Sequence, residues 1–324
     1  MKNKVLVTGA AGFIGSNLSE YLLDKGYEVI GLDNFSTGYE KNLIGLHKND
    51  NFQFLRGDIR DFSTCLKASK GVSFVLHQAA LGSVPRSIKD PLTSNEVNIN
   101  GFLNILEASR QNSVKRFIFA ASSSTYGDAK ELPKVEENIG KPLSPYALTK
   151  FVNELYSEIY SKTYGLETIG LRYFNVFGRR QDPNGAYAAV IPKFISQFLK
   201  GKAPTVNGDG SFSRDFTYIE NVLQMNYLAI TTTKAEAINQ VYNTAVGDRV
   251  TLLEMTNQIK KGLIQYDPSI ADIELIFGPI REGDLPHSQA SIEKAKNLLN
   301  YIPSHNFIEG IEASLEWYYN NLKT

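Results

Sequence analysis

The sequence predicts an α/β protein with a doubly wound parallel sheet and a smaller C-terminal α/β lobe. Two observations lead to this fold class. Strand-length apolar runs alternate with segments of helical periodicity over the first half of the chain, and a glycine-rich turn joins the first run to the first helical segment. The 324 residues are enough for a large core, in one big domain or in two.

The first 175 residues hold the predicted sheet. Strands are expected at residues 4–8, 28–33, 52–55, 72–77, 116–121 and 167–173. Between them, helices are expected at about 15–25, 61–69, 94–112 and 145–164. Alternating strands and helices favour a parallel sheet that helices cover on both faces, the arrangement called the Rossmann fold. We expect residues 1–175 to form one domain of this type.

The pattern changes after Asn175. Loops rich in Gly, Pro and Asn at 178–185 and 207–213 alternate with helices, which are expected near 189–200, 220–231, 252–263 and 307–322. We interpret residues 176–324 mainly as a substrate-binding lobe, with some segments returning to the main sheet.

Charge and composition argue against several functions. The chain carries 34 Lys plus Arg against 34 Asp plus Glu, so no global field attracts nucleic acid or an anionic membrane. Cys65 is the single cysteine, which excludes an intrachain disulfide and a cysteine-based metal cluster. The four histidines lack metal-ligand spacing, so we expect no metal. No apolar run could span a bilayer and no signal peptide precedes the first strand, so a reducing, cytoplasmic setting fits best.

The first turn has the spacing that holds a dinucleotide. Gly9 lets the backbone turn sharply, Gly12 lets it approach a pyrophosphate, and Gly15 lets the following helix pack closely on the sheet. The free amide groups at the N-terminus of that helix then face the phosphates. Asp33 ends the second strand, where its carboxylate can accept hydrogen bonds from the adenosine ribose. No Arg or Lys follows at 34–37 to offset a 2′-phosphate, so we expect NAD rather than NADP.

A tyrosine and a lysine four residues apart are candidates for acid–base catalysis. Tyr146 and Lys150 share one face of a helix downstream of the strand at 116–121 and of the serines at 122–124. Open α/β sheets bind ligands at this end of a strand. We expect the Lys150 ammonium and a cationic nicotinamide to lower the pKa of Tyr146 from its ordinary value of about 10. Tyr146 then removes a proton from a substrate hydroxyl as the carbon beneath gives its hydride to the cofactor, and Ser122 bridges the two oxygens.

The same residues carry a resemblance to a known superfamily, the extended short-chain dehydrogenases/reductases. Residues 172–178, 208–210 and 214–216 resemble more narrowly its nucleotide-sugar epimerases. The likeness covers essentially the whole chain, and it is closest to the UDP-N-acetylglucosamine 4-epimerase group, alongside UDP-glucose 4-epimerases. The other residues that carry it are Gly9, Gly12, Gly15, Asp33, Asp58, Ile59, Ser122, Tyr146 and Lys150.

The resemblance implies which residues hold the cofactor. It implies that Asp58 and Ile59 lie near the adenine, and that the residues at 78–80 and Tyr173 lie along the nicotinamide side. The alternative for Asp58 is a simple helix cap. The residues expected to contact NAD are Gly9, Gly12, Phe13, Ile14, Gly15, Asp33, Asn34, Ser36, Gly38, Asp58, Ile59, Gln78, Ala79, Ala80, Tyr146, Lys150 and Tyr173.

The resemblance also implies a UDP-sugar site. Asn175 is expected to contact the diphosphate, Arg214 and Arg281 to neutralise it, and Asp284 to bind the uridine ribose. The alternative for Arg214 is a structural ion pair with Asp215. The residues expected to contact the substrate are Gly82, Ser83, Ser122, Ser123, Ser124, Tyr146, Asn175, Ala189, Val190, Val206, Arg214, Arg281, Asp284 and Ser288.

The expected reaction is reversible epimerisation at carbon 4, by transient oxidation to a keto sugar on tightly bound NAD. Related dehydratases carry acids just after the position of Ser122, where this chain has two further serines. Small residues at Gly82 and Ser288 leave room for an acetamido group, unless they are only a loop glycine and a surface serine. We therefore expect UDP-GlcNAc and UDP-GalNAc to be preferred over UDP-glucose and UDP-galactose. The alternatives are another NAD(P)-dependent nucleotide-sugar oxidoreductase (a keto-sugar reductase or decarboxylase) and a redox-sensing binding protein.

The helices expected at 94–112 and 145–164 also suggest a homodimer. By analogy with the family, their apolar side chains form a four-helix interface between two copies. The alternative is that these side chains face the sheet, as in ordinary amphipathic helices. The side chains concerned are Phe102, Leu103, Leu106, Phe151, Leu155 and Tyr156.

Overall fold

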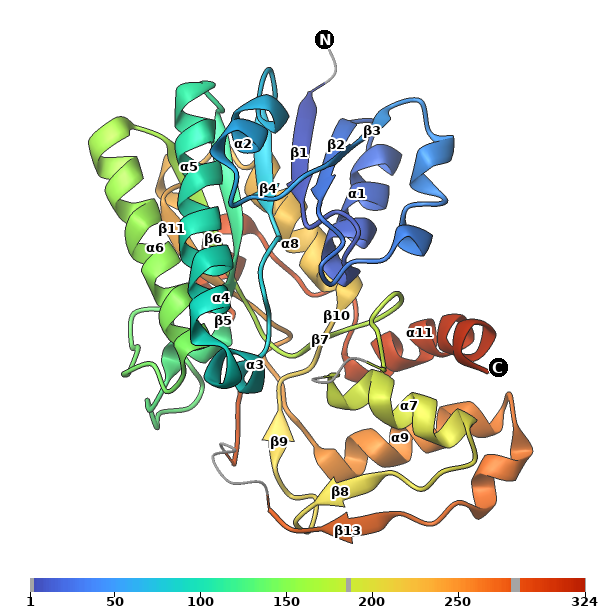
Figure 1. Ribbon diagram of the computed structural model, residues 1–324. Coiled ribbons are helices and arrows are strands. Elements are labelled where there is room, and N and C mark those ends of the chain that lie inside the picture. Colours follow the sequence, from blue (N-terminus) through green and yellow to red (C-terminus); the bar gives the residue numbers. More distant parts are fainter. Residues whose placement is uncertain (1–2, 185–187, 281–285, 324) are drawn as a thin grey trace.

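The computed structural model describes residues 3–184, 188–280 and 286–323, and a single seven-stranded sheet forms its centre (Figure 1). The strands lie in the order β11-β6-β5-β4-β1-β2-β3, and every neighbouring pair is parallel. The predicted doubly wound parallel sheet is confirmed. The strands are β1 (Lys4–Thr8), β2 (Glu28–Asp33), β3 (Phe52–Arg56), β4 (Phe74–His77), β5 (Arg116–Ser122), β6 (Glu167–Tyr173) and β11 (Gln240–Thr244).

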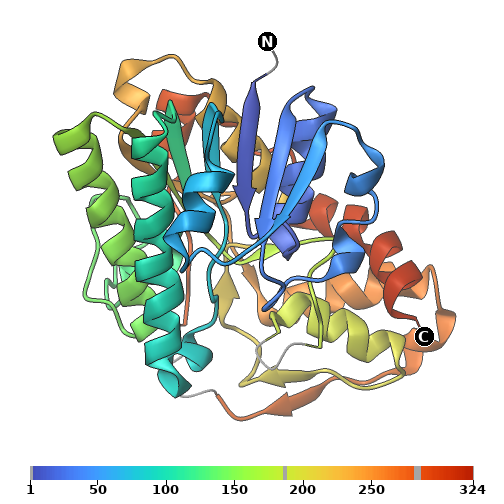
Figure 2. The ribbon, with the colours of Figure 1, turned by 45° about the horizontal axis from the view of Figure 1, so that its top comes forward.

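Alternate side chains of each strand supply two cores, one on each face of the sheet. In β1, Val5 and Val7 join the core beneath α1 and α8, whereas Leu6 joins the core beneath α2, α5 and α6. Figures 1 and 2 both show α5 and α6 side by side along the second face. Covering of both faces explains why the strands read as continuous apolar runs. These helices are α1 (Phe13–Asp24), α2 (Phe62–Ala68), α5 (Phe102–Gln111), α6 (Pro145–Tyr164) and α8 (Ile219–Thr231).

The helix α8 packs on the sheet although its sequence lies in the second half of the chain. Arg116, buried at the start of β5, is paired with Glu167 at the start of β6 at 2.7 Å. A cation at the C-terminal end of a helix also interacts favourably with the negative end of the helix dipole. The same guanidinium donates hydrogen bonds to carbonyl oxygens at the end of α8, those of Ala229, Ile230 and Thr232 at 2.7, 3.2 and 3.1 Å. One buried side chain thus fixes this end of α8 to the sheet.

The remaining part of the second half forms a lobe of packed helices and short strand pairs, at the bottom of Figure 1. α7, α9 and α11 pack against one another, and capping boxes at Thr251 and Asn306 begin α9 and α11. Each predicted helix end here falls at or next to the observed one. The elements are β7 (Val176–Phe177), α7 (Val190–Leu199), β8 (Thr205–Asn207), β9 (Ser213–Arg214), β10 (Thr217–Tyr218), β12 (Val250–Thr251), α9 (Leu252–Ile264), β13 (Ile276–Gly278) and α11 (Phe307–Leu322). The helix α10 (Glu293–Leu299) lies apart from this lobe and packs against β11 of the central sheet.

One predicted helix is interrupted. The region expected as a single helix at 94–112 consists of α4 (Pro91–Asn95), a π-helical segment (Glu96–Gly101) and α5. Within the π segment, the buried amide of Asn98 accepts from the backbone nitrogen of Leu81 at 2.8 Å and donates to its carbonyl oxygen at 3.2 Å. Such wide turns often mark functional sites. Here the turn anchors the segment that follows β4.

No helix within the described ranges is both long and apolar enough to cross a membrane. The described residues also bring together no group of three or more His, Cys, Asp or Glu side chains that could hold a metal ion. The cytoplasmic location and the absence of a metal stay predictions.

Candidate active site

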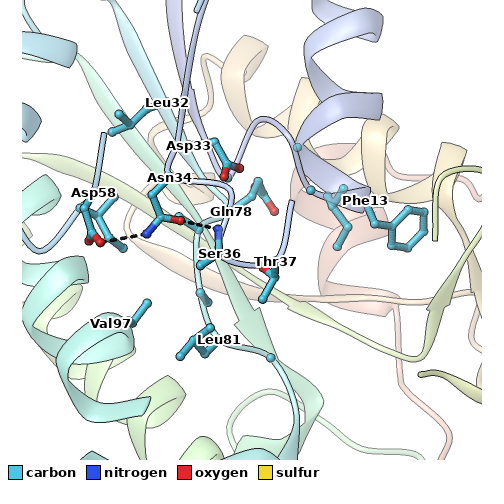
Figure 3. Close-up of a pocket in the computed structure, with 18 of the residues that line it drawn as sticks. Phe13, Leu32, Asp33, Asn34, Ser36, Thr37, Asp58, Gln78, Leu81 and Val97 are labelled. Carbon is cyan, nitrogen blue, oxygen red and sulfur yellow. Dashed lines mark hydrogen bonds between the residues drawn. The ribbon is translucent and has the colours of Figure 1, made fainter. Parts of the chain in front are cut away.

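A cavity of about 340 Å³ opens at the carboxyl ends of β1, β2 and β4 (Figure 3). The order of the sheet reverses here, because β1 pairs with β2 on one side and with β4 on the other. Open parallel sheets bind ligands at such a switch point. The cavity is lined by Gly9, Gly12, Phe13, Ile14, Gly15, Leu32, Asp33, Asn34, Ser36, Thr37, Gly57, Asp58, Ile59, Gln78, Ala79, Ala80, Leu81, Gly82 and Val97.

The turn between β1 and α1 has the shape that a pyrophosphate needs. Gly9 has a φ of +69°, a left-handed conformation that favours glycine. A Cβ atom on Gly15 would overlap the carbonyl oxygen of Gly9, so only glycine lets α1 approach the turn so closely. Gly12 begins α1 without a side-chain cap, which leaves amide groups of the first helical turn available to an anion. The turn therefore fits a dinucleotide.

Asp33, at the end of β2, is held by the turn itself. Its carboxylate accepts hydrogen bonds from the backbone nitrogens of Ala11 at 2.9 Å and Phe35 at 2.7 Å, and burial raises its pKa. Its remaining lone pairs can accept from ribose hydroxyls. The strand pairing adds one cation that a search of residues 34–37 missed, because Arg56 lies opposite Asp33 on β3. Its guanidinium lies 5.6 Å from the centre of the Phe35 ring, and Arg56 is outside the cavity lining.

Asp58 is a second fixed acceptor in the cavity. Hydrogen bonds from Arg60 are the main cause that lowers its pKa to about 2, and Asn34 donates to it at 2.8 Å, as Figure 3 shows. The helix α2 is capped by Asp61, whose carboxylate accepts from the Ser63 nitrogen at 3.0 Å. The alternative of Asp58 as a helix cap is therefore wrong.

Most of the predicted cofactor residues line this one cavity, together with Gly82 from the predicted substrate set. Gly38 lies outside the lining. A Cβ atom on Gly38 would come within 2.8 Å of the Ala11 Cβ, so glycine at this position serves the packing of the turn. Val97 lies on the π segment, and no sequence signal indicated it. The other lining residues that the prediction missed directly adjoin predicted ones in the sequence, and they are Leu32, Thr37, Gly57 and Leu81.

The serine, tyrosine and lysine predicted for catalysis converge from two neighbouring elements. Ser122 is the last residue of β5, the strand beside β4. Ser144 caps α6 and a proline follows it, which places Tyr146 in the first turn and Lys150 in the next. The Lys150 Nζ donates to the carbonyl oxygen of Ala120 on β5 at 2.7 Å, and it lies 6.0 Å from the centre of the Tyr146 ring.

Burial controls the charge of both groups. It raises the pKa of Tyr146 above the ordinary value, and a hydrogen bond with Ser122 offsets only part of this rise. Burial lowers the pKa of Lys150 to about 8, against an opposing effect of Glu154. Lys150 alone therefore does not bring the pKa of Tyr146 below its ordinary value, and the expectation that Lys150 and a cationic nicotinamide together lower this pKa stays a prediction. A further positive charge beside the phenol is needed to ionise it near neutral pH.

A second tyrosine, Tyr173, ends β6 and pairs in register with Ser122. Its hydroxyl donates to Oε1 of Gln78 at 3.0 Å, and burial raises its pKa to about 12. Its proton is therefore committed to a residue of the cavity lining. Tyr146 is left as the candidate for proton transfer.

The predicted substrate residues come from several segments around the end of the sheet. The Asn175 amide donates to the carbonyl oxygen of Asp215 at 3.0 Å, and the Ser288 nitrogen donates to that of Ser213 at 3.0 Å. Arg214 reaches the carbonyl oxygen of Pro286 at 3.2 Å, so residues 286–288 lie beside β9. Of the others, Ser83 caps α3 (Val84–Lys89), Ser123 and Ser124 follow β5, Ala189 and Val190 begin α7, Val206 is buried in β8, and Arg281 and Asp284 lie outside the described residues.

The buried carboxylate of Asp215 holds these segments together. It accepts hydrogen bonds from the backbone nitrogens of Val246, Gly247 and Ala290 at 3.1, 3.1 and 3.2 Å. The Asp215 carboxylate thus binds backbone nitrogens rather than forming the alternative ion pair with Arg214. The sequence did not indicate this role. The arrangement links the strand end at 214–215 to the segment that carries Ser288.

Several known proteins with similar sequences and structures are described as sugar-nucleotide epimerases. Residues 5–245 match the family described as NAD dependent epimerase/dehydratase. A putative UDP-glucose 4-epimerase of Methanocaldococcus jannaschii is 36% identical over 322 residues, which cover 99% of this chain and 100% of that protein. A UDP-N-acetylglucosamine 4-epimerase of Methanobrevibacter ruminantium, solved with UDP-N-acetylmuramic acid, has a TM-score of 0.91 at 37% identity, over 99% of both chains. A UDP-glucuronic acid 4-epimerase of Bacillus cereus, solved with UDP-glucuronic acid and NAD, has a TM-score of 0.86 at 32% identity, over 98% of this chain and 99% of that one.

These similarities agree with the geometry. They extend over nearly the whole chain, and the expected resemblance to nucleotide-sugar epimerases is confirmed. The expectation of NAD as cofactor is confirmed as well. A glycine turn at the switch point, two fixed carboxylates beyond it and a Ser–Tyr–Lys group at the next strand end thus agree with the sequence comparison, and the chain belongs to the NAD-dependent epimerase/dehydratase family.

Proposed function

We propose that this protein interconverts the two carbon-4 epimers of a UDP-sugar, with NAD held throughout the cycle. The observation that carries the proposal is the convergence of Ser122, Tyr146 and Lys150 at the end of β5, next to the strand that leads into the dinucleotide cavity. The 4-epimerases among similar proteins support it. Bound NAD supplies the hydride acceptor at carbon 4 and returns the same hydride in the reverse step.

The chain's own residues move the proton that accompanies the hydride. Tyr146 takes the proton of the carbon-4 hydroxyl during oxidation and gives a proton to the keto oxygen during reduction. The Ser122 oxygen accepts a hydrogen bond from the Ser124 hydroxyl at 2.9 Å, so its own proton is available to bridge phenol and substrate. Lys150 keeps a positive charge beside the phenol up to a pH of about 8, the value to which burial lowers its pKa. Inversion requires the keto sugar to turn its other face before the hydride returns.

Dehydration is disfavoured at this site. The residues that follow Ser122 are Ser123 and Ser124, whose hydroxyls are not acids near neutral pH. Of the other enzymatic candidates, a net reductase would release its cofactor after each turnover. Retention of the dinucleotide therefore separates the two.

We propose further that residues 176–324 mainly bind the UDP part, with Asn175 and Arg214 at the diphosphate. Gly82 lines the dinucleotide cavity next to the expected sugar position, and a Cβ atom there would meet no atom within 4 Å. Space of this kind and the serine at 288 favour an acetamido sugar. UDP-GlcNAc and UDP-GalNAc are therefore the proposed substrates, with slower turnover of UDP-glucose and UDP-galactose.

Purified protein incubated with UDP-GlcNAc and no added cofactor is expected to form UDP-GalNAc, as measured by chromatography of the nucleotide sugars. Tyr146→Phe removes the proton carrier and is expected to lower kcat by at least about 100-fold. Tyr164→Phe, at the exposed end of the same helix, is the control and is expected to keep wild-type turnover. Full loss of dinucleotide on desalting, with stoichiometric use of added NADH, would instead favour the reductase.

Ser288→Tyr tests the sugar preference. The larger side chain is expected to fill the space assigned to the acetamido group, so activity on UDP-GlcNAc is lost while activity on UDP-glucose is kept. Because both rates are measured on one variant, unfolding cannot imitate the result. Equal loss on both sugars would refute the assignment of Ser288 to this pocket.

We also propose a homodimer that forms through α6. Phe102 and Leu106 are buried against the sheet, so these two predicted interface residues face inward. Leu148, Leu155 and Ile159 share the outer side of α6 and remain 51%, 42% and 53% exposed. Since an apolar stripe of this kind is costly to leave in water, a second copy of the helix is its proposed partner.

Light scattering at low micromolar concentration is expected to give twice the chain mass of 36.1 kDa. The double variant Leu155→Glu/Ile159→Glu is expected to give the single-chain mass with an unchanged circular dichroism spectrum. A monomeric wild-type protein would contradict the proposal.

A further inference from the structure

Gln78, Tyr173 and Asn226 form a closed ring of three hydrogen bonds at the edge of the dinucleotide cavity. The Asn226 Nδ2 donates to the Tyr173 hydroxyl at 2.9 Å. That hydroxyl donates to the Gln78 Oε1 at 3.0 Å, and the Gln78 Nε2 donates to the Asn226 Oδ1 at 3.3 Å. Each member donates once and accepts once, all in the same sense around the ring. Hydrogen bonds in such chains polarise and strengthen one another.

The sense of the ring is set by the backbone of α8. Two amides and a hydroxyl could form the same ring in either direction, because both amide groups can turn over. The second hydrogen of the Asn226 Nδ2, however, is donated to the carbonyl oxygen of Val222 at 2.8 Å. Only a nitrogen can lie there, so the Asn226 oxygen must face Gln78. The orientation of Gln78 and the direction of the Tyr173 hydroxyl follow from this one contact.

Asn226 itself is rigidly held. Its side chain is fully buried, and the C-terminal end of α8 is fixed to the sheet by the buried guanidinium of Arg116. The ring therefore joins a firmly attached helix to two strand ends, those of β4 and β6.

The ring acts on the cavity through Gln78. This side chain lines the cavity, and Figure 3 shows it behind the loop that follows Asp33. The Gln78 Nε2 carries two hydrogens and the ring uses one, which leaves one N–H group for a ligand. The ring also fixes Tyr173, the residue that pairs in register with Ser122. Both the cofactor cavity and the proposed reaction centre thus have one wall whose geometry depends on Asn226.

We propose that Asn226 is a positioning residue that holds Gln78 and Tyr173 in the orientation in which they bind the dinucleotide. The inference rests on the cofactor role assigned to this cavity and on the proposed need to retain NAD through each cycle. The hydrogen bonds of Asn226 join it to Gln78, Tyr173 and Val222, and not to Ser122 or Tyr146. Its effect is expected in cofactor retention and kcat, and not in the KM for the UDP-sugar.

The test compares Asn226→Leu with Asn221→Leu. Leucine has the same branched shape and number of heavy atoms as asparagine but makes no hydrogen bonds, so the first change opens the ring. Asn221 is a matched control, because it is also a buried asparagine on α8, and its amide instead serves the backbone of Ser304 and His305. Both variants are expected to lose thermal stability, while only Asn226→Leu is expected to release the dinucleotide, about tenfold faster than wild type.

Tyr173→Phe opens the same ring by removing one hydroxyl and little else. If the three side chains act as one unit, the double variant Asn226→Leu/Tyr173→Phe releases the dinucleotide no faster than the faster single variant. Release is measured by absorbance and fluorescence of the dinucleotide that remains after gel filtration, so this readout needs no turnover. With NAD in excess, kcat is expected to fall in Asn226→Leu and the KM for UDP-GlcNAc to stay at its wild-type value.

Wild-type retention in folded Asn226→Leu would overturn the inference, as would equal loss in Asn221→Leu or strictly additive effects in the double variant. If Asn226→Leu does not fold, Tyr173→Phe decides, since unchanged retention in that variant also overturns it. A wild-type protein that keeps its dinucleotide but epimerises no UDP-sugar would refute the proposed function and leave this inference standing.

Discussion

The parallel register of β1, β4, β5 and β6 is the constraint on which the whole site depends. It aligns Thr8 with His77, His77 with Phe119, and Ser122 with Tyr173. Because parallel strands end at the same edge, the glycine turn after β1, the segment after β4 and the serine at the end of β5 meet without help from long loops. Helix α6, which lies with α2 and α5 on one face of the sheet, then adds Tyr146 and Lys150. A change in the pairing of any of these strands would separate cofactor cavity and catalytic group.

The packing of α6 against the sheet also determines the protonation of the two proposed catalytic residues. Helix α6 brings Tyr146 and Lys150 together, but their burial also raises the pKa of the phenol and lowers that of the ammonium to about 8. Neither residue is therefore prepared for proton transfer by its neighbours alone. The positive charge of an oxidised nicotinamide would favour the phenolate, and this charge is lost on reduction. Proton transfer and hydride transfer are in this way linked through one electrostatic interaction.

Local patterns in the sequence predict much of this structure. The spacing of Gly9, Gly12 and Gly15 predicts the turn, because at each position a side chain would prevent the local backbone conformation or packing. The apolar strand-length runs predict the parallel sheet, and the structure confirms this prediction. Contacts between distant segments could not be predicted in the same way. Asn226 and Asp215 carry no motif, and their roles arise only when α8 and residues 246–290 fold back beside the sheet. Tertiary packing also determines three further features that the spacing of residues in the sequence does not predict. These are the π segment, the packing role of Gly38 and the direction of the pKa shift of Tyr146.

The pKa of Tyr146 in the two oxidation states of the bound cofactor tests this electrostatic link between proton and hydride transfer most directly. It is obtained by ultraviolet difference titration of the phenolate, with the Tyr146→Phe protein subtracted. We expect a pKa at least about one unit lower with the oxidised than with the reduced dinucleotide, because only the oxidised ring is positively charged. Equal values in the two states would contradict it, since the phenol would then ionise independently of the hydride acceptor.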